Sequence, residues 1–184
     1  MNKGSFFIGR GASGVRGFSL LELMVVLALA SVLATLAIPS YQALLQRWAL
    51  RTEAQALVDD LRHARAQALS RGQSVSICPS VDGRMCAAHA DWGHGWLIFL
   101  DLDANRVIAA TELVLRQHRV TSTIRSISSN SNASLAGLTF APNGQARGAG
   151  QGLTLLGAGT SRRLVCVSMQ GRAVMRPEGQ TQCA

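Results

Sequence analysis

The stretch Arg16–Ser40, RGFSLLELMVVLALASVLATLAIPS, decides how this chain is organised. After a glycine, the residues Phe18–Ile38 carry a single charge, on Glu22. As an α-helix this run would be about 31 Å long, enough to cross the hydrocarbon core of a bilayer. A carboxylate at membrane depth costs roughly 3 kcal/mol, so Glu22 requires a compensating partner.

The residues before the run determine its orientation. Residues 1–17 contain Lys3, Arg10 and Arg16 and no acid. Positive residues before a membrane helix stay cytoplasmic, which sends the later residues outward. The run lacks the small-residue cleavage site of a secretory signal at its end, so we expect it to remain. The chain is therefore predicted to cross a membrane once, with its C-terminal part on the outer side.

The helix is expected to continue beyond the membrane. Pro39 removes one backbone hydrogen bond and is expected to kink it. Apolar residues then recur at spacings of three and four, with the charged residues largely outside this stripe. We expect Gly72 to cap the end of the helix. The stripe consists of Leu50, Ala54, Leu57, Leu61, Ala64 and Ala68.

After Gly72 the pattern changes to short β-prone runs between turn residues, which predicts an antiparallel β domain over 72–184. The segments 128–134 and 144–152 are expected to be loops. The predicted strands are Ser74–Cys78, Trp96–Asp101, Val107–Ala110, Glu112–Leu115, Ser122–Ile127, Leu138–Phe140, Leu153–Leu156, Arg163–Ser168 and Ala173–Met175. The fold class is therefore α+β: a helix with a membrane half over 18–38 and an amphipathic half over 39–71, packed on the β domain.

The charge is unevenly distributed. The net charge is +8, from 18 basic and 10 acidic residues. After residue 120 there are six arginines and one acid, Glu178. A basic excess of this kind is usually a solvated face, and less often a surface for nucleic acid or anionic lipid.

Four cysteines follow the apolar run, at positions that would lie in an oxidising compartment. Four cysteines allow three pairings, and the simplest joins Cys78 to Cys86 and Cys166 to Cys183. A zinc site of Cys78, Cys86, His89 and His94 is the alternative, but its spacing matches no common zinc pattern.

Catalytic and metal-binding patterns are weak. Asp101, Asp103, Asn105 and Glu112 have the spacing of a calcium loop, but Arg106 stands where that loop requires glycine. A polar hairpin turn explains the same residues. There is no nucleophile elbow and no phosphate-binding loop. We therefore expect a protein that is not an enzyme and that has no metal or cofactor.

The residues Gly17–Leu23, GFSLLEL, followed by the apolar run, resemble the N-terminal signature of type IV pilins and pseudopilins. The resemblance implies that a prepilin peptidase cuts between Gly17 and Phe18, removing the leader 1–17, and methylates the new amine of Phe18. It assigns Glu22 to filament assembly. A carboxylate and an ammonium cost less in hydrocarbon as a pair than alone, which agrees with this assignment.

The rest of the chain has a strand ending in Cys-Pro, the Asp-Trp and Gly-Trp pairs, and a C-terminal strand with Cys, a Gly-Arg turn and a last Cys. These motifs resemble the GspH/FimT family of minor pilins. We expect Trp92, Trp96 and Phe99 to be packing residues. The resemblance implies a pilin fold and four partners: prepilin peptidase, other major and minor pilins, an inner-membrane assembly platform and membrane lipid.

Some members of this family bind DNA during natural transformation through a C-terminal Gly-Arg-x-Arg motif. Gly171 and Arg172 match it, but Val174 occupies the second arginine position and the next arginine is Arg176. Arg172 and Arg176 would point to the same side of an extended strand. Together with Arg162 and Arg163 they form the candidate contact surface for double-stranded DNA.

The resemblance implies a minor pilin that is built into a type IV pilus, where it contributes to assembly or priming and is a candidate for DNA uptake. It also implies that the chain crosses the inner membrane once with its C-terminal domain in the periplasm, and lies in a surface pilus after assembly. The alternative is a minor pseudopilin of a type II secretion system. That class has the same N-terminal features.

Overall fold

A computed structural model describes residues 17–87, 91–121, 123–129, 136–148, 151–159 and 161–183 of the chain. The chain divides into two units, Met1–Tyr41 and Gln42–Ala184. One helix, α1 (Leu20–Arg71), begins in the first unit and ends in the second. Each unit is described here by itself.

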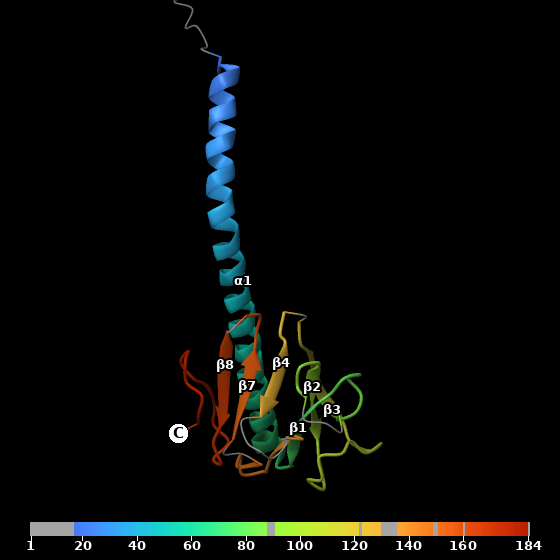
Figure 1. The fold of residues 1–184 in the computed structure, drawn as a ribbon. Helices are drawn as coiled ribbons and strands as arrows, with labels where there is room; N and C mark the ends of the chain where they lie inside the picture. Colours follow the sequence, from blue (N-terminus) through green and yellow to red (C-terminus); the bar gives the residue numbers. More distant parts are fainter. Residues whose placement is uncertain are drawn as a thin grey trace, which may run out of the picture. The chain divides into compact units, whose positions relative to one another are not determined.

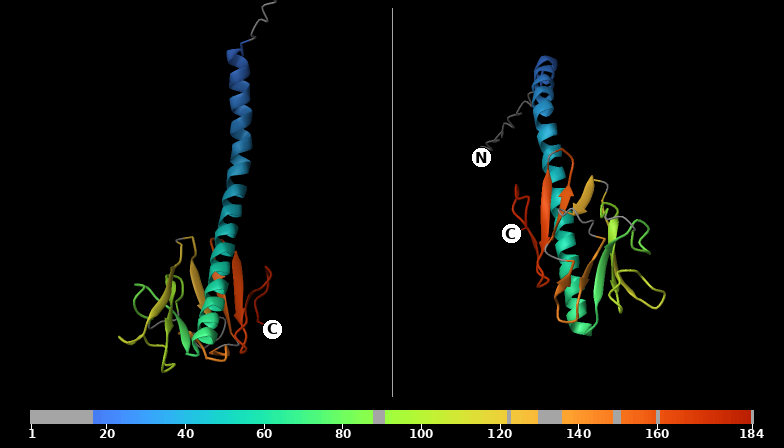
Figure 2. Two further views of the ribbon diagram at one scale, coloured as in Figure 1. Left: turned by 180° about the vertical axis from the view of Figure 1, so that it is seen from behind. Right: turned by 60° about the horizontal axis from the view of Figure 1, so that its bottom comes forward.

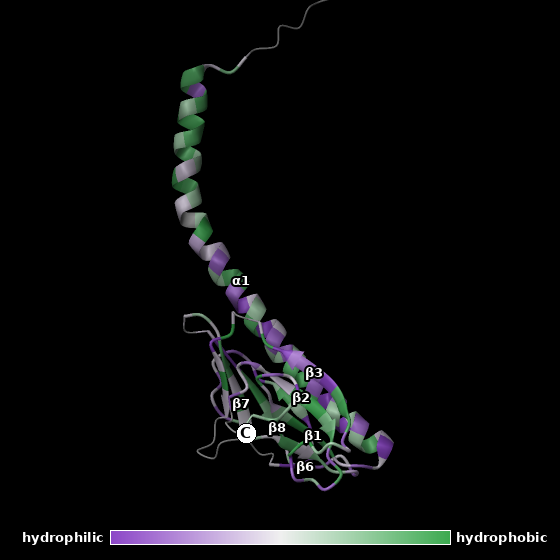
Figure 3. Ribbon diagram, turned by 90° about the vertical axis from the view of Figure 1, so that its right-hand side faces the viewer, coloured by the Kyte–Doolittle hydropathy of each residue, from purple (hydrophilic) through white to green (hydrophobic). Residues whose placement is uncertain are grey.

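The first unit is the apolar half of α1. Its large side chains are exposed, from Phe18 at 81% to Ile38 at 55%, and Figure 3 shows this half as mostly hydrophobic. The helix is long and apolar enough to cross a membrane. Two of its hydroxyl groups are satisfied locally: those of Ser31 and Thr35 donate to the carbonyls of Ala28 and Val32, both at 2.7 Å. Such bonds suit a helix in lipid, where water is absent.

The second unit has two antiparallel sheets packed on the later turns of α1 (Figures 1 and 2). The first sheet has the order β3-β2-β1-β5-β6 and the second the order β4-β7-β8-β9. The strands of the first are β1 (Val75–Pro79), β2 (Gly95–Leu100), β3 (Val114–Arg119), β5 (Leu138–Phe140) and β6 (Ala146–Arg147). Those of the second are β4 (Ser126–Ser129), β7 (Gln151–Leu156), β8 (Arg162–Val167) and β9 (Ala173–Met175).

The main core lies between α1 and the inner faces of both sheets. All six residues of the predicted helical stripe are at most 2% exposed, which confirms the periodicity. They pack with Val75 and Ile77 of β1, Leu153 and Leu155 of β7, and Val165 of β8. The helix ends as predicted: the Gly72 N–H donates to the Ala68 carbonyl at 3.0 Å, and Gly72 has a φ of 63°, which glycine adopts without strain.

A smaller core covers the outer face of the first sheet. Cys78, Leu97 and Phe99 are fully buried there, with Cys86 and Ile108 packed against them. A disulfide joins Cys78 to Cys86, so the loop after β1 is tied down over this face. Trp92 and Trp96 lie in the main core, and Phe99 in this smaller one, so all three are packing residues as expected.

A polar network is buried between α1 and the first sheet. Trp96 Nε1 donates to Asp60 at 2.8 Å, and Arg116 forms an ion pair with Asp60 at 3.1 Å. Glu53 lies 2.9 Å from His118 Nε2, and the His118 ring stacks on Trp96 with centroids 4.2 Å apart.

The burial of these two acids corrects a prediction. Charged residues of α1 were expected to lie largely outside the packed stripe, but Glu53 is only 5% exposed and Asp60 only 2%. Burial is tolerated because each carboxylate is hydrogen-bonded, and Glu53 also accepts from the Thr121 N–H at 3.0 Å.

Several strand predictions differ from the structure. Val107–Ala110 is not a strand but part of the loop between β2 and β3. Strand β3 spans Val114–Arg119 and so extends beyond the predicted Glu112–Leu115. Its polar residues 116–119 pair with β2 through the backbone, and β3 lies at the edge of the first sheet, where polar side chains are tolerated. The predicted strand Ser122–Ile127 overlaps β4 only at Ser126 and Ile127, since residues 123–125 are not in a strand and residue 122 lies outside the described residues. Strand β4 thus extends into the predicted loop 128–134, and β6 and the start of β7 fall inside the predicted loop 144–152.

The buried network predicts that replacing two adjacent acids of α1 lowers the free energy of unfolding by unequal amounts. Asp60→Ala removes the acceptor of a buried indole N–H and the partner of Arg116. We expect it to lower the free energy of unfolding of residues 42–184 by about 2–3 kcal/mol in urea titrations. The control is Asp59→Ala, whose side chain is 56% exposed and pairs with Arg62 at 3.5 Å. That change should cost less than about 0.5 kcal/mol. Equal costs would contradict the role assigned to Asp60.

Glu53 predicts a dependence of stability on pH. Burial raises its pKa, but hydrogen bonds from His118 and the Thr121 N–H outweigh burial and hold the pKa below its ordinary value of 4.5. Because the pKa of Glu53 is lower in the folded than in the unfolded state, ionised Glu53 stabilises the fold at pH values above 4.5. This stabilisation is lost as the pH falls through the folded-state pKa. Glu53→Gln should therefore cost about 1 kcal/mol near neutral pH, and the gap from wild type should narrow as the pH falls below 4.5. Parallel curves of unfolding free energy against pH would refute this.

Candidate functional site

The start of α1 has a defined geometry. Gly17, Phe18 and Ser19 precede the helix, and Ser19 Oγ accepts the Glu22 N–H at 3.1 Å. Ser19 is thus the N-cap and Glu22 the third helical residue, which is the spacing of a capping box. The sequence pattern Ser-x-x-Glu at residues 19–22 is the signal from which this cap can be predicted.

Glu22 is an acid surrounded by apolar residues. Its neighbours Leu20, Leu21 and Leu23 are 76%, 72% and 54% exposed. The Glu22 carboxylate has no partner within the ranges that the structure describes. It lies in the first turn of α1, where the positive end of the helix dipole favours negative charge, typically by less than 1 kcal/mol. In hydrocarbon this gain would not offset the cost of placing the carboxylate there.

The second candidate site is the outer face of the second sheet. A disulfide joins Cys166 of β8 to Cys183, which holds the C-terminal segment against this sheet. Cys166 pairs with Val174 of β9, so their side chains share one face. By alternation, Arg162, Arg172 and Arg176 belong to the same face.

The four predicted arginines lie in two pairs. Arg172 and Arg176 line one hollow of about 390 Å³ beside the Cys166–Cys183 disulfide, and Arg162 and Arg163 line another of about 340 Å³ at the C-terminal segment. Arg172 is exposed and Arg176 is half-buried. Arg162 is exposed on the same face, at the other end of β8.

Arg163 does not join this face. It follows Arg162 directly on β8, so it belongs to the opposite face, with Leu155 as its cross-strand partner. Its guanidinium pairs with Glu178 at 3.0 Å, and its side chain is only 14% exposed. The sequence predicts Arg172 and Arg176 on a surface near Arg162 and Arg163. In the structure Arg163 does not share the sheet face of the other three, because adjacent strand residues point to opposite sides.

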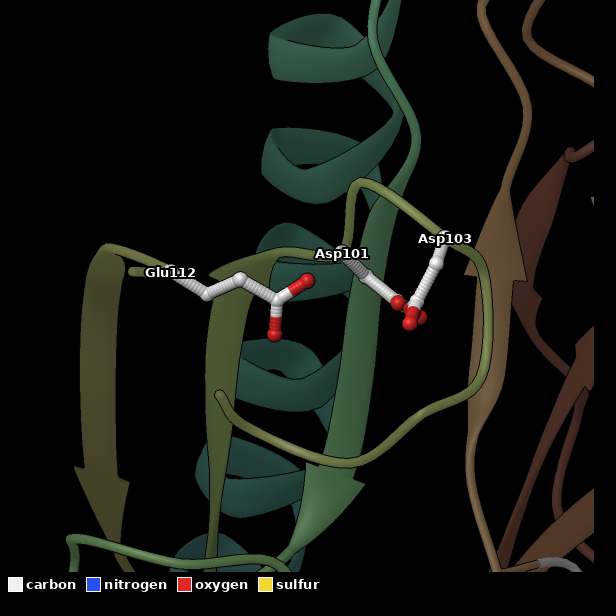
Figure 4. Close-up of side chains that lie close together, drawn as sticks. All are labelled: Asp101, Asp103 and Glu112. Atoms are coloured by element: carbon white, nitrogen blue, oxygen red, sulfur yellow. The ribbon is translucent and has the colours of Figure 1, made fainter. Parts of the chain in front are cut away.

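Three acids with the calcium-loop spacing do lie together in the β2–β3 loop. Carboxylate oxygens of Asp101, Asp103 and Glu112 come within 4.8 Å of one another (Figure 4). Most of their hydrogen bonds are to the loop itself. Asp101 accepts the N–H groups of Asn105 and Arg106, both at 3.0 Å, and Glu112 accepts the Leu102 N–H at 2.8 Å and the Ala109 N–H at 2.9 Å.

These bonds account for the acidic cluster as a scaffold for the loop. Asp101 also accepts from Ser76 of β1, so it connects the loop to the first sheet. Arg106 has a φ of 64°, a conformation that favours glycine, and the network holds it there. The zinc alternative is excluded in its proposed form because Cys78 and Cys86 are joined by a disulfide and cannot act as thiolate ligands. Its third member, His89, lies outside the described residues.

Two sequence families match the chain. Residues 13–38 match the prokaryotic N-terminal methylation motif. Residues 53–171 match the family described as type II transport protein GspH. The first match covers the helix start with Glu22, and the second covers α1 from Glu53 onward and the β domain up to Gly171, just before β9.

Solved structures show the same fold. The type IV minor pilin FimU of Pseudomonas aeruginosa is similar with a TM-score of 0.56 and 26% identity, over 71% of this chain and 90% of that one. A second crystal form of FimU has a TM-score of 0.55 and 25% identity, over 71% of this chain and 95% of that one.

The minor pseudopilin EpsH from the type II secretion system of Vibrio cholerae has a TM-score of 0.50 and 12% identity, over 71% of this chain and 98% of that one. This similarity bears on the fold alone. The chain has one long helix with antiparallel sheets, a methylation motif at the start of the helix and a family match over residues 53–171. These three observations agree on one family. The chain belongs to the GspH family of pilin-like proteins, whose members are structural subunits with an N-terminal membrane anchor and a soluble C-terminal domain.

Proposed function

We propose that this protein is a minor pilin of a type IV pilus, processed by a prepilin peptidase and assembled through the apolar half of α1. The observation that carries the proposal is the methylation motif at residues 13–38, which runs directly into an exposed apolar helix. Such a surface is unfavourable in water, and lipid or neighbouring apolar helices would cover it.

Processing would create the cation that Glu22 lacks. A cut between Gly17 and Phe18 gives Phe18 a free amine one helical turn from Glu22. Methylation leaves this amine positively charged at neutral pH. In a filament the ammonium of one subunit would pair with Glu22 of the next, because both charges cost less in an apolar setting when they are paired.

The type IV assignment is favoured over type II secretion by sequence similarity. FimU, a type IV minor pilin, is 26% identical over 71% of the chain. EpsH, a type II pseudopilin, is 12% identical and informs only the fold. A minor pseudopilin is the alternative that the assembly experiment below is designed to test.

Removing the Glu22 charge should separate processing from assembly. Glu22→Gln keeps the side-chain size and the Ser19 cap, which involves only the backbone N–H of residue 22. Co-expressed with a prepilin peptidase, the variant should lose residues 1–17 and gain one methyl group, as the wild type does, when measured by mass spectrometry. With a type IV assembly system, its yield in sheared pili should fall at least about tenfold, as expected for an unpaired charge in an apolar interface.

Ser31→Ala is the control, because Ser31 bonds only within its own helix and should assemble normally. Normal incorporation of Glu22→Gln would contradict the charge-pairing mechanism. Incorporation of the wild type by a type II secretion system but not by a type IV system would favour the pseudopilin alternative.

A second function, binding of double-stranded DNA, is favoured by one observation. Arg172 and Arg176 line the same hollow on the disulfide-bound face of the second sheet, with Arg162 on that face as well. Arginine groups on one face contact phosphates without reading sequence. We infer a weak, salt-dependent contact and not a sequence-specific site.

The DNA proposal predicts a defined loss. In the full chain in detergent, Arg172→Ala with Arg176→Ala should weaken binding to a short duplex at low salt. It should also reduce the slope of log K against log salt by about 2, since two phosphate contacts are removed. The control is Arg51→Ala with Arg71→Ala, which removes two exposed charges from α1. Equal losses in both variants would indicate attraction by net charge alone.

A further inference from the structure

Strand β9 leaves one edge of the second sheet open. It is the last strand in the order β4-β7-β8-β9, and no other described strand pairs with its outer edge. Ser168 N–H donates to the Arg172 carbonyl at 2.9 Å and Arg176 N–H to the Leu164 carbonyl at 2.8 Å, so these positions bond to β8. In an antiparallel ladder, successive residues direct their backbone N–H and C=O groups alternately toward and away from the neighbouring strand. Since Arg172 and Arg176 bond to β8, the N–H and C=O groups of Ala173 and Met175 point away from β8.

A groove runs beside this edge, between β9 and α1. It has a volume of about 400 Å³, and we call it the α1–β9 groove. The residues of its wall that matter here are Arg62, Arg65 and Leu69 of α1, and Arg172, Ala173 and Val174 at β9. Leu69 is 51% exposed and Val174 is 38% exposed, so the groove offers apolar surface between arginines.

Arg65 is held in place by two turns. Its Nε donates to the Gly144 carbonyl at 3.0 Å, and a Cβ on Gly171 would come within 3.0 Å of that nitrogen. Gly171 has a φ of 76°, which also favours glycine. The terminal nitrogens of Arg65 have no partner among the residues that the structure describes. The groove therefore contains a guanidinium group that is already positioned and still has donors to offer.

The other arginines add to the positive charge. Among the residues that the structure describes, Arg62 pairs with Asp59 alone, at 3.5 Å, and its side chain is 57% exposed. The side chain of Arg172 is exposed and makes no contact with an acid in the described ranges. Carboxylates pair favourably with such groups, often through two hydrogen bonds at once.

We propose that the edge of β9 and the α1–β9 groove dock an extended, acidic segment of a neighbouring subunit, which pairs with β9 as an added strand. Only an extended polypeptide can satisfy the outward N–H and C=O groups of Ala173 and Met175 while placing alternate side chains in an apolar groove. Nucleic acid offers phosphates for the arginines but has no groups that continue a β ladder. This chemistry favours a peptide over DNA.

Only the identity of the partner rests on the proposed function. In a filament the neighbouring subunit is held at high effective concentration, so a weak strand pairing is sufficient. The docking chemistry itself depends on residues of the β domain and α1, and can be tested without a filament.

The test uses the full chain in detergent micelles and a fluorescent peptide of alternating Val and Glu, about ten residues long. We expect saturable binding, and no binding of the same peptide with Lys in place of Glu. Arg62→Ala with Arg65→Ala should weaken binding about tenfold. The control, Arg51→Ala with Arg71→Ala, removes the same charge elsewhere on α1. It should leave the peptide affinity within about twofold of the wild-type value.

A second variant tests the strand pairing. Met175→Pro removes an outward N–H, which an edge strand tolerates, and leaves the arginines in place. It should abolish peptide binding while circular dichroism and the melting temperature show a folded protein. Hydrogen exchange of the Ala173 and Met175 amides should slow when the peptide binds to the wild type.

Three results would overturn the inference: unchanged exchange at both amides, wild-type affinity in Met175→Pro, or a short DNA duplex that requires Arg62 and Arg65 while the peptide does not bind. None of these bears on filament assembly, which is tested separately through Glu22.

Discussion

The buried acids of α1 are the constraint on which the rest of the β domain depends. Apolar contacts are not directional, so a helix packed only through alanine and leucine could slide or rotate against two sheets. Glu53 and Asp60 lie about two turns apart on one side of α1, and both accept hydrogen bonds from the first sheet or the residues just after it. Hydrogen bonds require defined distances and angles, so these two points set the register of helix and sheet.

The second sheet is secured differently. Its inner face contacts α1 through apolar residues such as Leu155 and Val165, and its outer face has the Cys166–Cys183 disulfide. Closing a loop of that size restricts the unfolded chain by roughly 3 kcal/mol. The other disulfide, Cys78–Cys86, covers the outer face of the first sheet. Each sheet therefore has the helix on one side and a covalently fixed segment on the other.

Predictions from sequence succeeded where a local period carries the information. The stripe of α1 has a helical period, and the apolar strands β1 and β2 are buried along nearly their whole length. Predictions failed where partners are distant in sequence. Val107–Ala110 is apolar but lies in a loop held by Asp101 and Glu112, and β3 is mostly exposed and charged. In the candidate site, alternation correctly grouped Arg172 with Arg176, and the same rule, applied to adjacent residues, separates Arg163 from Arg162.

The basic surface of the β domain follows from this use of acids inside the fold. Glu53, Asp60 and Asp101 are buried, and Glu112 is engaged in the loop between β2 and β3. These acids satisfy hydrogen bonds of the scaffold, so they are not available near Arg62, Arg65, Arg172 or Arg176. A chain of net charge +8 thus presents more positive charge on the second sheet than its composition suggests. Because Glu53 and Asp60 also align α1 with the first sheet, the contacts that establish the fold leave the second sheet free to meet an anionic partner.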